Sequence, residues 1–112
     1  MRKYTIVLSI AVIALTLTYC HSSKKVATSV SAVSFNQDIK PLVIKNCSPC
    51  HTGNSRKGAY DVYANAKQDI NDIIRRIELN PGDHGFMPMR RAKLSDSTIA
   101  VFKQWRDGGA KE

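Results

Sequence analysis

The chain has 112 residues and a formal net charge of +8 at pH 7. This length accommodates one small domain, and no internal repeat or low-complexity segment is present, so a repeat architecture is excluded. A domain of this size buries a limited apolar core and often needs a covalent or bound group as a staple.

The beginning of the chain has the pattern of an export signal. A positively charged start is followed by the apolar stretch 4–18, which is shorter than the roughly 18 residues of a membrane-spanning helix. Leu17-Thr18-Tyr19-Cys20 resembles the end of a bacterial lipoprotein signal, although Tyr19 replaces the usual small residue. We therefore expect residues 1–19 to be a signal peptide and Cys20 to carry a lipid that anchors the protein on the periplasmic side. The alternatives are cleavage to a soluble periplasmic protein and an uncleaved N-terminal anchor.

Residues 20–33 are expected to form a flexible linker after the lipidated cysteine. They are rich in Ser, Thr, Ala and Val and follow neither a helical nor a strand period. A linker of this length reaches about 20 Å. Lys24 and Lys25 suit either contact with anionic lipid headgroups or simple solubilisation of the tether. The domain itself is expected to span residues 34–112.

The first helix of the domain is expected at 38–46. Ile39, Leu42 and Val43 recur at helical spacing. Pro41 fits the first turn of such a helix, because the N–H group that proline lacks would have no partner there. The helix leads directly into Cys47.

Cys47-Ser48-Pro49-Cys50-His51 is the most specific motif of the chain. C-x-x-C-H is the attachment pattern of c-type haem: two thioethers form to the vinyl groups, and the histidine binds iron. A zinc site would need two further Cys or His ligands, and a thioredoxin-like pair would need a βαβ context. Neither is found here, so the motif predicts one covalent haem c. Haem of this kind is attached outside the bacterial cytoplasm, which agrees with export and makes nucleic acid an unsuitable partner.

A second helix is expected within 61–79, with the segment 65–69 as a possible break into two shorter helices. Asn80-Pro81-Gly82-Asp83 is a strong stop and turn signal. The apolar positions follow steps of three and four: Val62, Ala66, Ile70, Ile73, Ile74 and Ile77.

The third helix is expected to follow Ser95, which is a good N-cap residue. Leu94 and Ile99 occupy the positions of a hydrophobic staple, and Gly108 suits a left-handed turn at the end. The stripe of Ile99, Phe102 and Trp105 is expected to pack in the core rather than to relay electrons. No strand pattern is found, so the fold class is expected to be all-α.

The segment His84-Gly85-Phe86-Met87-Pro88-Met89 offers a second ligand for iron. A thioether sulfur opposite histidine is the arrangement of cytochromes c and raises the reduction potential. Met87 is our choice, because it lies in a turn before Pro88 that can hold it in place. Met89 is the first alternative, His84 the second, and an open position the third.

Together these stretches resemble a small bacterial mono-haem cytochrome c of class I type. Residues 34–42 and the C-x-x-C-H motif are similar to its entry helix and haem turn, and Phe86-Met87-Pro88 to its ligand loop. Residues 93–96, with Trp105 and Gly108, resemble its last helix. The chain departs from the family at Met89-Arg90-Arg91, where members often have Pro or Gly.

The resemblance implies a cytochrome c-like fold of three or four helices around one haem, and an electron carrier. Two firm iron ligands would leave no site for a small-molecule substrate, so an enzyme is not expected. Arg90, Arg91 and Lys93 suit either docking to an acidic surface on redox partner proteins or a solvated basic loop. The alternatives are a haem-bearing subunit of a larger membrane redox complex, and a haem sensor or enzyme with a displaceable sixth ligand.

Overall fold

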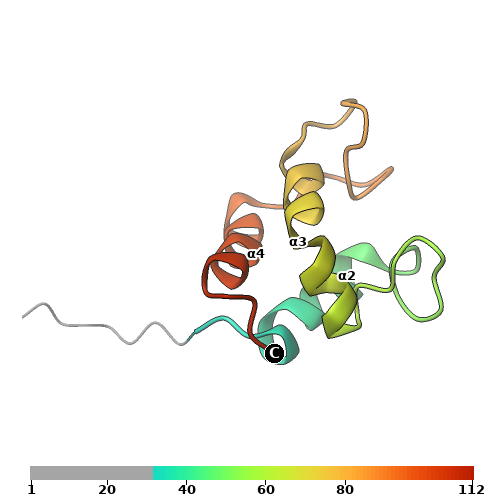
Figure 1. Ribbon diagram of the computed structural model, residues 1–112. Helices are drawn as coiled ribbons and strands as arrows, with labels where there is room; N and C mark the ends of the chain where they lie inside the picture. Colours follow the sequence, from blue (N-terminus) through green and yellow to red (C-terminus); the bar gives the residue numbers. More distant parts are fainter. Residues whose placement is uncertain (1–31) are drawn as a thin grey trace, which may run out of the picture.

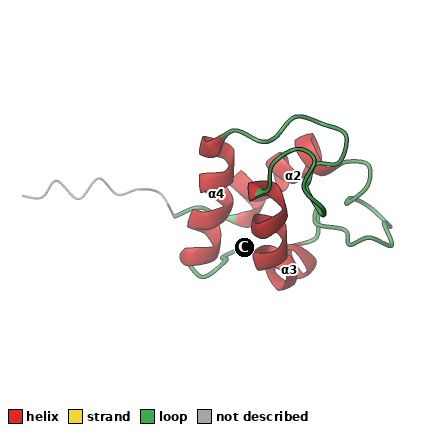
Figure 2. Cartoon of the chain, turned by 90° about the horizontal axis from the view of Figure 1, so that it is seen from above, coloured by secondary structure: helices red, strands yellow, loops and turns green. Residues whose placement is uncertain are grey.

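The computed structural model describes residues 32–112, and these form an all-α domain (Figures 1 and 2). A π-helical turn, η2, covers Phe35–Ile39 and continues into α2, Lys40–Cys47; α3 covers Tyr63–Glu78 and α4 covers Asp96–Asp107. No strand occurs in this part of the chain, which confirms the all-α prediction. None of its helices is long and apolar enough to cross a membrane. The predicted signal peptide, Cys20 and most of the linker lie outside the described residues.

The first helical segment begins three residues earlier than expected. Ser34 is its N-cap, and the Ser34 N–H group donates to the carboxylate of Asp38 at 2.8 Å. Pro41 lies in the first turn of α2, as expected, but the π-helical turn precedes it, so the proline is inside a longer helical run. A proline ring crowds the carbonyl group four residues before it, and the wider π turn, in which the Lys40 N–H group reaches Phe35 O, accommodates that crowding.

The helix α3 is continuous, so the possible break at 65–69 is not present. Asn65, in the first turn, directs its side-chain amide back to Ala59 O at 3.1 Å. Val62 precedes the helix and is 47% exposed, so its assignment to the apolar stripe was wrong. The other five positions of the stripe are buried, because they lie on the face that packs against the rest of the domain.

The limits of α4 agree closely with the sequence. Ser95 caps its start, with Oγ accepting from the Thr98 N–H group at 3.2 Å. The left-handed turn, however, is one residue later than expected: Gly108 has φ −78° and Gly109 has φ +89°. The chain then turns back, and the Ala110 N–H group donates to Trp105 O at 2.8 Å.

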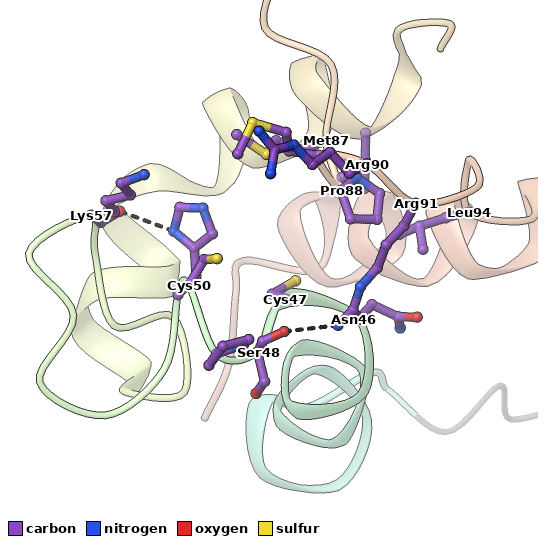
Figure 3. A pocket seen from close by; sticks show the side chains of 14 residues that line it. Asn46, Cys47, Ser48, Cys50, Lys57, Met87, Pro88, Arg90, Arg91 and Leu94 are labelled. Atoms are coloured by element: carbon purple, nitrogen blue, oxygen red, sulfur yellow. Dashed lines mark hydrogen bonds between the residues drawn. The ribbon is translucent and has the colours of Figure 1, made fainter.

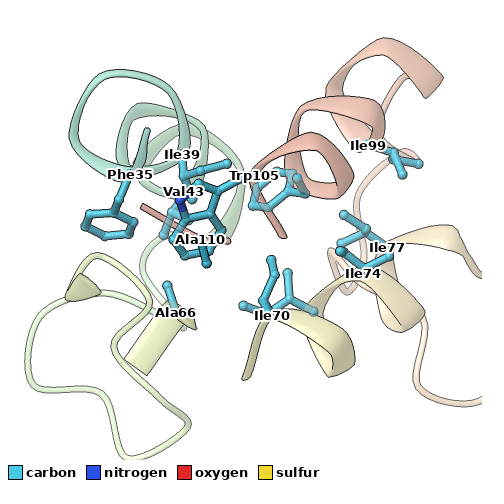
Figure 4. Packing of buried hydrophobic residues seen from close by; sticks show 12 residues of the cluster. Phe35, Ile39, Val43, Ala66, Ile70, Ile74, Ile77, Ile99, Trp105 and Ala110 are labelled. Carbon is cyan, nitrogen blue, oxygen red and sulfur yellow. The ribbon is translucent and has the colours of Figure 1, made fainter. Parts of the chain in front are cut away.

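The hydrophobic core lies between η2, α3 and α4 (Figure 4). The expected stripe on α4 is buried, and Trp105 at its end is fully enclosed. The rings of Trp105 and Phe35 have their centroids 5.8 Å apart, so the stripe packs against the first helical segment. The core residues are Phe35, Ile39, Val43, Ala66, Ile70, Ile73, Ile74, Ile77, Ile99, Phe102, Trp105 and Ala110.

The residues after α4 join the three helical segments at one end of the domain. The carbonyl oxygen of Lys111 accepts from the Phe35 N–H group at 2.9 Å and from the Trp105 indole N–H group at 2.6 Å. The carbonyl oxygen of Ala110 accepts from the Tyr63 hydroxyl at 3.0 Å. These bonds leave no buried side-chain polar atom unpaired among the described residues.

Candidate functional site

At the other end of the domain is a cavity of about 280 Å³ (Figure 3). One wall is the turn after α2, residues 47–51, which we call the cysteine turn. The other is the connection between α3 and α4, residues 80–94, which we call the methionine loop. The cavity brings together five of the predicted site residues, namely Cys47, Cys50, His51, Met87 and Met89.

The two cysteines of the turn are free thiols with different exposure. Cys47 ends α2 and packs against the core, whereas Cys50 is exposed. Burial raises the pKa of the Cys47 thiol to about 11, and the nearby guanidinium of Arg91 offsets a part of this rise. The Cys47 sulfur is therefore protonated at neutral pH. The backbone N–H group of His51 donates to Cys47 O at 3.0 Å. This bond folds the turn so that both cysteines and the histidine border one cavity.

The imidazole of His51 is held by two contacts. Its Nδ1 atom lies 2.9 Å from Lys57 O, and since a carbonyl oxygen only accepts, Nδ1 carries the proton. Its ring stacks on Tyr60, with centroids 4.8 Å apart and planes 7° from parallel. This tautomer leaves the lone pair of Nε2 for a ligand such as a metal ion. Burial and the carboxylate of Asp69 raise the pKa of the Tyr60 hydroxyl.

A glycine makes the stacking on His51 possible. Gly58 has φ +94°, and a Cβ atom at this position would lie 2.9 Å from Cε1 of Tyr60. Nearby, the Ser55 hydroxyl donates to Cys50 O, which ties the loop after His51 to the cysteine turn. Gly58 lies in the connection between α2 and α3. Nothing in the sequence spacing pointed to Tyr60, because the contact depends on how the loop folds back.

The methionine loop is fixed to the end of α3. The Met87 N–H group donates to Arg76 O at 3.2 Å, and the Arg76 guanidinium reaches Gly85 O at 3.4 Å. Lys93 donates through Nζ to Glu78 O at 2.7 Å, where a cation also suits the negative end of the helix dipole. The position of Met87 over the cavity thus depends on α3.

The three candidates for the second iron ligand lie in different environments. Met87 is partly buried, lines the cavity and packs against the core. Met89 also lines the cavity, but its side chain is 54% exposed. His84 is exposed and is not part of the cavity lining. Of the three, Met87 is the best placed to meet a group held by the cysteine turn.

The three basic residues of the loop differ in their contacts. The side chain of Lys93 is engaged at the end of α3. Arg91 crosses the mouth of the cavity and donates to Ser48 O at 3.2 Å (Figure 3). Arg90 is exposed and makes no hydrogen bond or ion pair within residues 32–112. The sequence could not reveal the contact of Arg91, because its acceptor is a backbone carbonyl on a distant segment.

In the described part of the chain, no cluster of three or more His, Cys, Asp or Glu side chains could hold a bare metal ion. The cavity has His51 on one wall and Met87 on the other. No protein-family model, curated protein or solved structure matched this chain. A function is therefore inferred from the cavity and its lining.

Proposed function

We propose that this protein is an exported mono-haem cytochrome c that transfers electrons between redox partner proteins. The observation that carries the proposal is the cavity, because it joins the C-x-x-C-H motif to Met87 from a separate part of the sequence. A motif in sequence can arise by chance. Its position across a cavity from a thioether in a separate segment supports the proposal independently of the motif.

The residues that line the cavity fit a haem. Cys47 and Cys50 are thiols without a disulfide, as thioether formation requires. His51 has a fixed tautomer with Nε2 free to bind. Ile77, Leu94 and Pro88 provide apolar surface for a porphyrin. When bound, haem would supply an iron that alternates between the ferrous and ferric states.

The chain's own residues would have three tasks in this function. The cysteines would hold the porphyrin edge, and His51 and Met87 would provide the two axial ligands. The apolar wall would keep water from the ring and favour a high potential. Two protein ligands leave no open position for a substrate, so we infer a carrier of electrons rather than an enzyme.

The proposal includes export and a lipid anchor at Cys20, which rest on the sequence alone. It also includes docking to an acidic surface of a partner. Arg90 supports the docking, since it is exposed beside the cavity and its charge is not used within the described residues. Such an interaction would weaken as salt concentration rises.

The test uses the full-length protein made in a host that attaches c-type haem, together with Met87→Ala and Met89→Ala variants. We expect a coloured protein whose mass includes one haem. The sulfur–iron charge-transfer band of the ferric protein is expected to disappear in Met87→Ala and to persist in Met89→Ala, the matched control.

Three outcomes would count against parts of this proposal. A colourless protein of unmodified peptide mass would reject the haem. A band that survives Met87→Ala but not Met89→Ala would make Met89 the ligand. If neither change affects the iron, His84 or an open position is the better account, and fast binding of carbon monoxide to the unmodified protein would then favour a sensor or enzyme.

A further inference from the structure

Arg91 links the two walls of the cavity. Its Nη2 atom donates to Ser48 O at 3.2 Å, and Nη1 lies 3.5 Å from Lys45 O. Ser48 lies between the two cysteines, and Lys45 lies in the last turn of α2. The guanidinium thus spans from the methionine loop to the end of the helix that carries Cys47.

This link has no substitute among the described residues. The other hydrogen bonds that hold the methionine loop, from Met87 and Lys93, end on α3 and its C-terminal end. Within residues 32–112, only Arg91 forms hydrogen bonds from the loop to α2 or to the cysteine turn. Among the described residues, Arg91 is therefore the one hydrogen-bonded link between the two walls, beside the packing of both walls against the core.

The chain between Met87 and Arg91 is short and tightly turned. The backbone N–H group of Arg91 donates to Pro88 O at 3.2 Å, which closes a tight turn directly after Met87. A displacement of Met87 away from the cysteine turn would therefore pull on the guanidinium. The influence of Arg91 on the pKa of Cys47 is a second sign that its charge lies close to the attachment site.

We propose that Arg91 is a positioning residue that clasps the methionine loop to the cysteine turn and so keeps Met87 over the cavity. This inference rests on the proposed function for its effect on the iron, but the clasp itself is a property of the polypeptide. A charged donor that bonds to carbonyl oxygens forms a stronger hydrogen bond than a neutral one, and the planar fork of arginine can serve two acceptors at once. Lysine at this position would keep the charge but lose the fork.

The experiment compares the full-length protein with Arg91→Gln, Arg91→Lys and Lys45→Gln. Lys45→Gln is the matched control, because it removes one positive charge at the end of α2 but leaves the Lys45 carbonyl in place. The first readout is hydrogen exchange of the Met87 amide, which is protected by its bond to Arg76 O. The second is the affinity of the ferric iron for added imidazole, which must displace Met87.

In Arg91→Gln we expect about a 10-fold loss of Met87 amide protection and about a 10-fold gain in imidazole affinity, or about 1.4 kcal/mol in each equilibrium. Arg91→Lys is expected to show a smaller change in the same direction. Lys45→Gln should match the unmodified protein, and all variants should unfold at similar denaturant concentrations. A purely structural role would instead lower stability throughout the domain.

The clasp is rejected if Arg91→Gln and Lys45→Gln behave alike in both readouts. It is also rejected if Arg91→Gln changes only the salt-dependent affinity for a redox partner, which would make Arg91 a docking residue. If the purified protein contains no haem, the proposed function fails, and the exchange of the Met87 amide alone then decides whether the clasp exists.

Discussion

The two ends of this domain are stabilised in different ways. At the core end, Trp105 and Phe35 are enclosed by apolar side chains from three helical segments, and Lys111 O accepts two hydrogen bonds beside them. At the cavity end, two loops border a cavity of about 280 Å³. Within the described residues, only Arg91 forms hydrogen bonds between these loops. The core end is thus completed by the polypeptide. The cavity end is lined by two loops, and if the proposed function holds, a change there should affect haem binding more than folding.

The largest expected effect is at the cavity end. In a variant with both Cys47→Ser and Cys50→Ser, covalently bound haem should be lost completely, since a hydroxyl does not form the thioether. Mass spectrometry and the visible absorption of the full-length protein measure this loss. Cys20→Ser is the control, and it should keep the haem while it changes any lipid mass. A double variant that still carries covalent haem would contradict the proposed attachment site.

At the core end, Trp105→Ala should destabilise the domain by about 3–5 kcal/mol, because it leaves a cavity and removes the indole donor to Lys111 O. Denaturant unfolding followed by circular dichroism measures the change. Gln104→Ala, at an exposed neighbour on α4, should shift stability by less than about 0.5 kcal/mol. Equal effects of the two substitutions would mean that the aromatic core contributes less than the packing indicates.

A smaller change in unfolding free energy is expected at Gly58, in the loop after His51. Gly58→Ala should cost about 1–3 kcal/mol, because the residue keeps φ +94° and its new methyl group would press on Tyr60. Gly53→Ala is the matched control, since Gly53 also has a positive φ, +63°, but open space around its Cβ position. The difference between the two unfolding free energies measures the contact with Tyr60. If the costs are equal, the position of Tyr60 against His51 is not constrained by Gly58.

The local sequence determined those elements whose signals are short in range. Ser95 began α4, the stripe of Ile99, Phe102 and Trp105 was buried, and residues 80–83 ended α3 as expected. Helical periodicity and side-chain caps act within one or two turns, so they are readable from one segment. The errors were also local: the start of the first helix, the place of Val62, and the left-handed residue at Gly109. Each depended on how the neighbouring chain packs or turns.

For the site, the sequence by itself supplied the chemical groups. These are two thiols, an imidazole, and three candidates for the second iron ligand of the proposed haem. Only the tertiary structure placed Met87 at the cavity, exposed Met89, and left His84 outside. It alone brought Tyr60 onto His51 and Arg91 onto Ser48 O. The physical reason is that a residue type fixes which bonds a side chain can form. Which bonds do form depends on distances between segments that are set by packing of the whole domain.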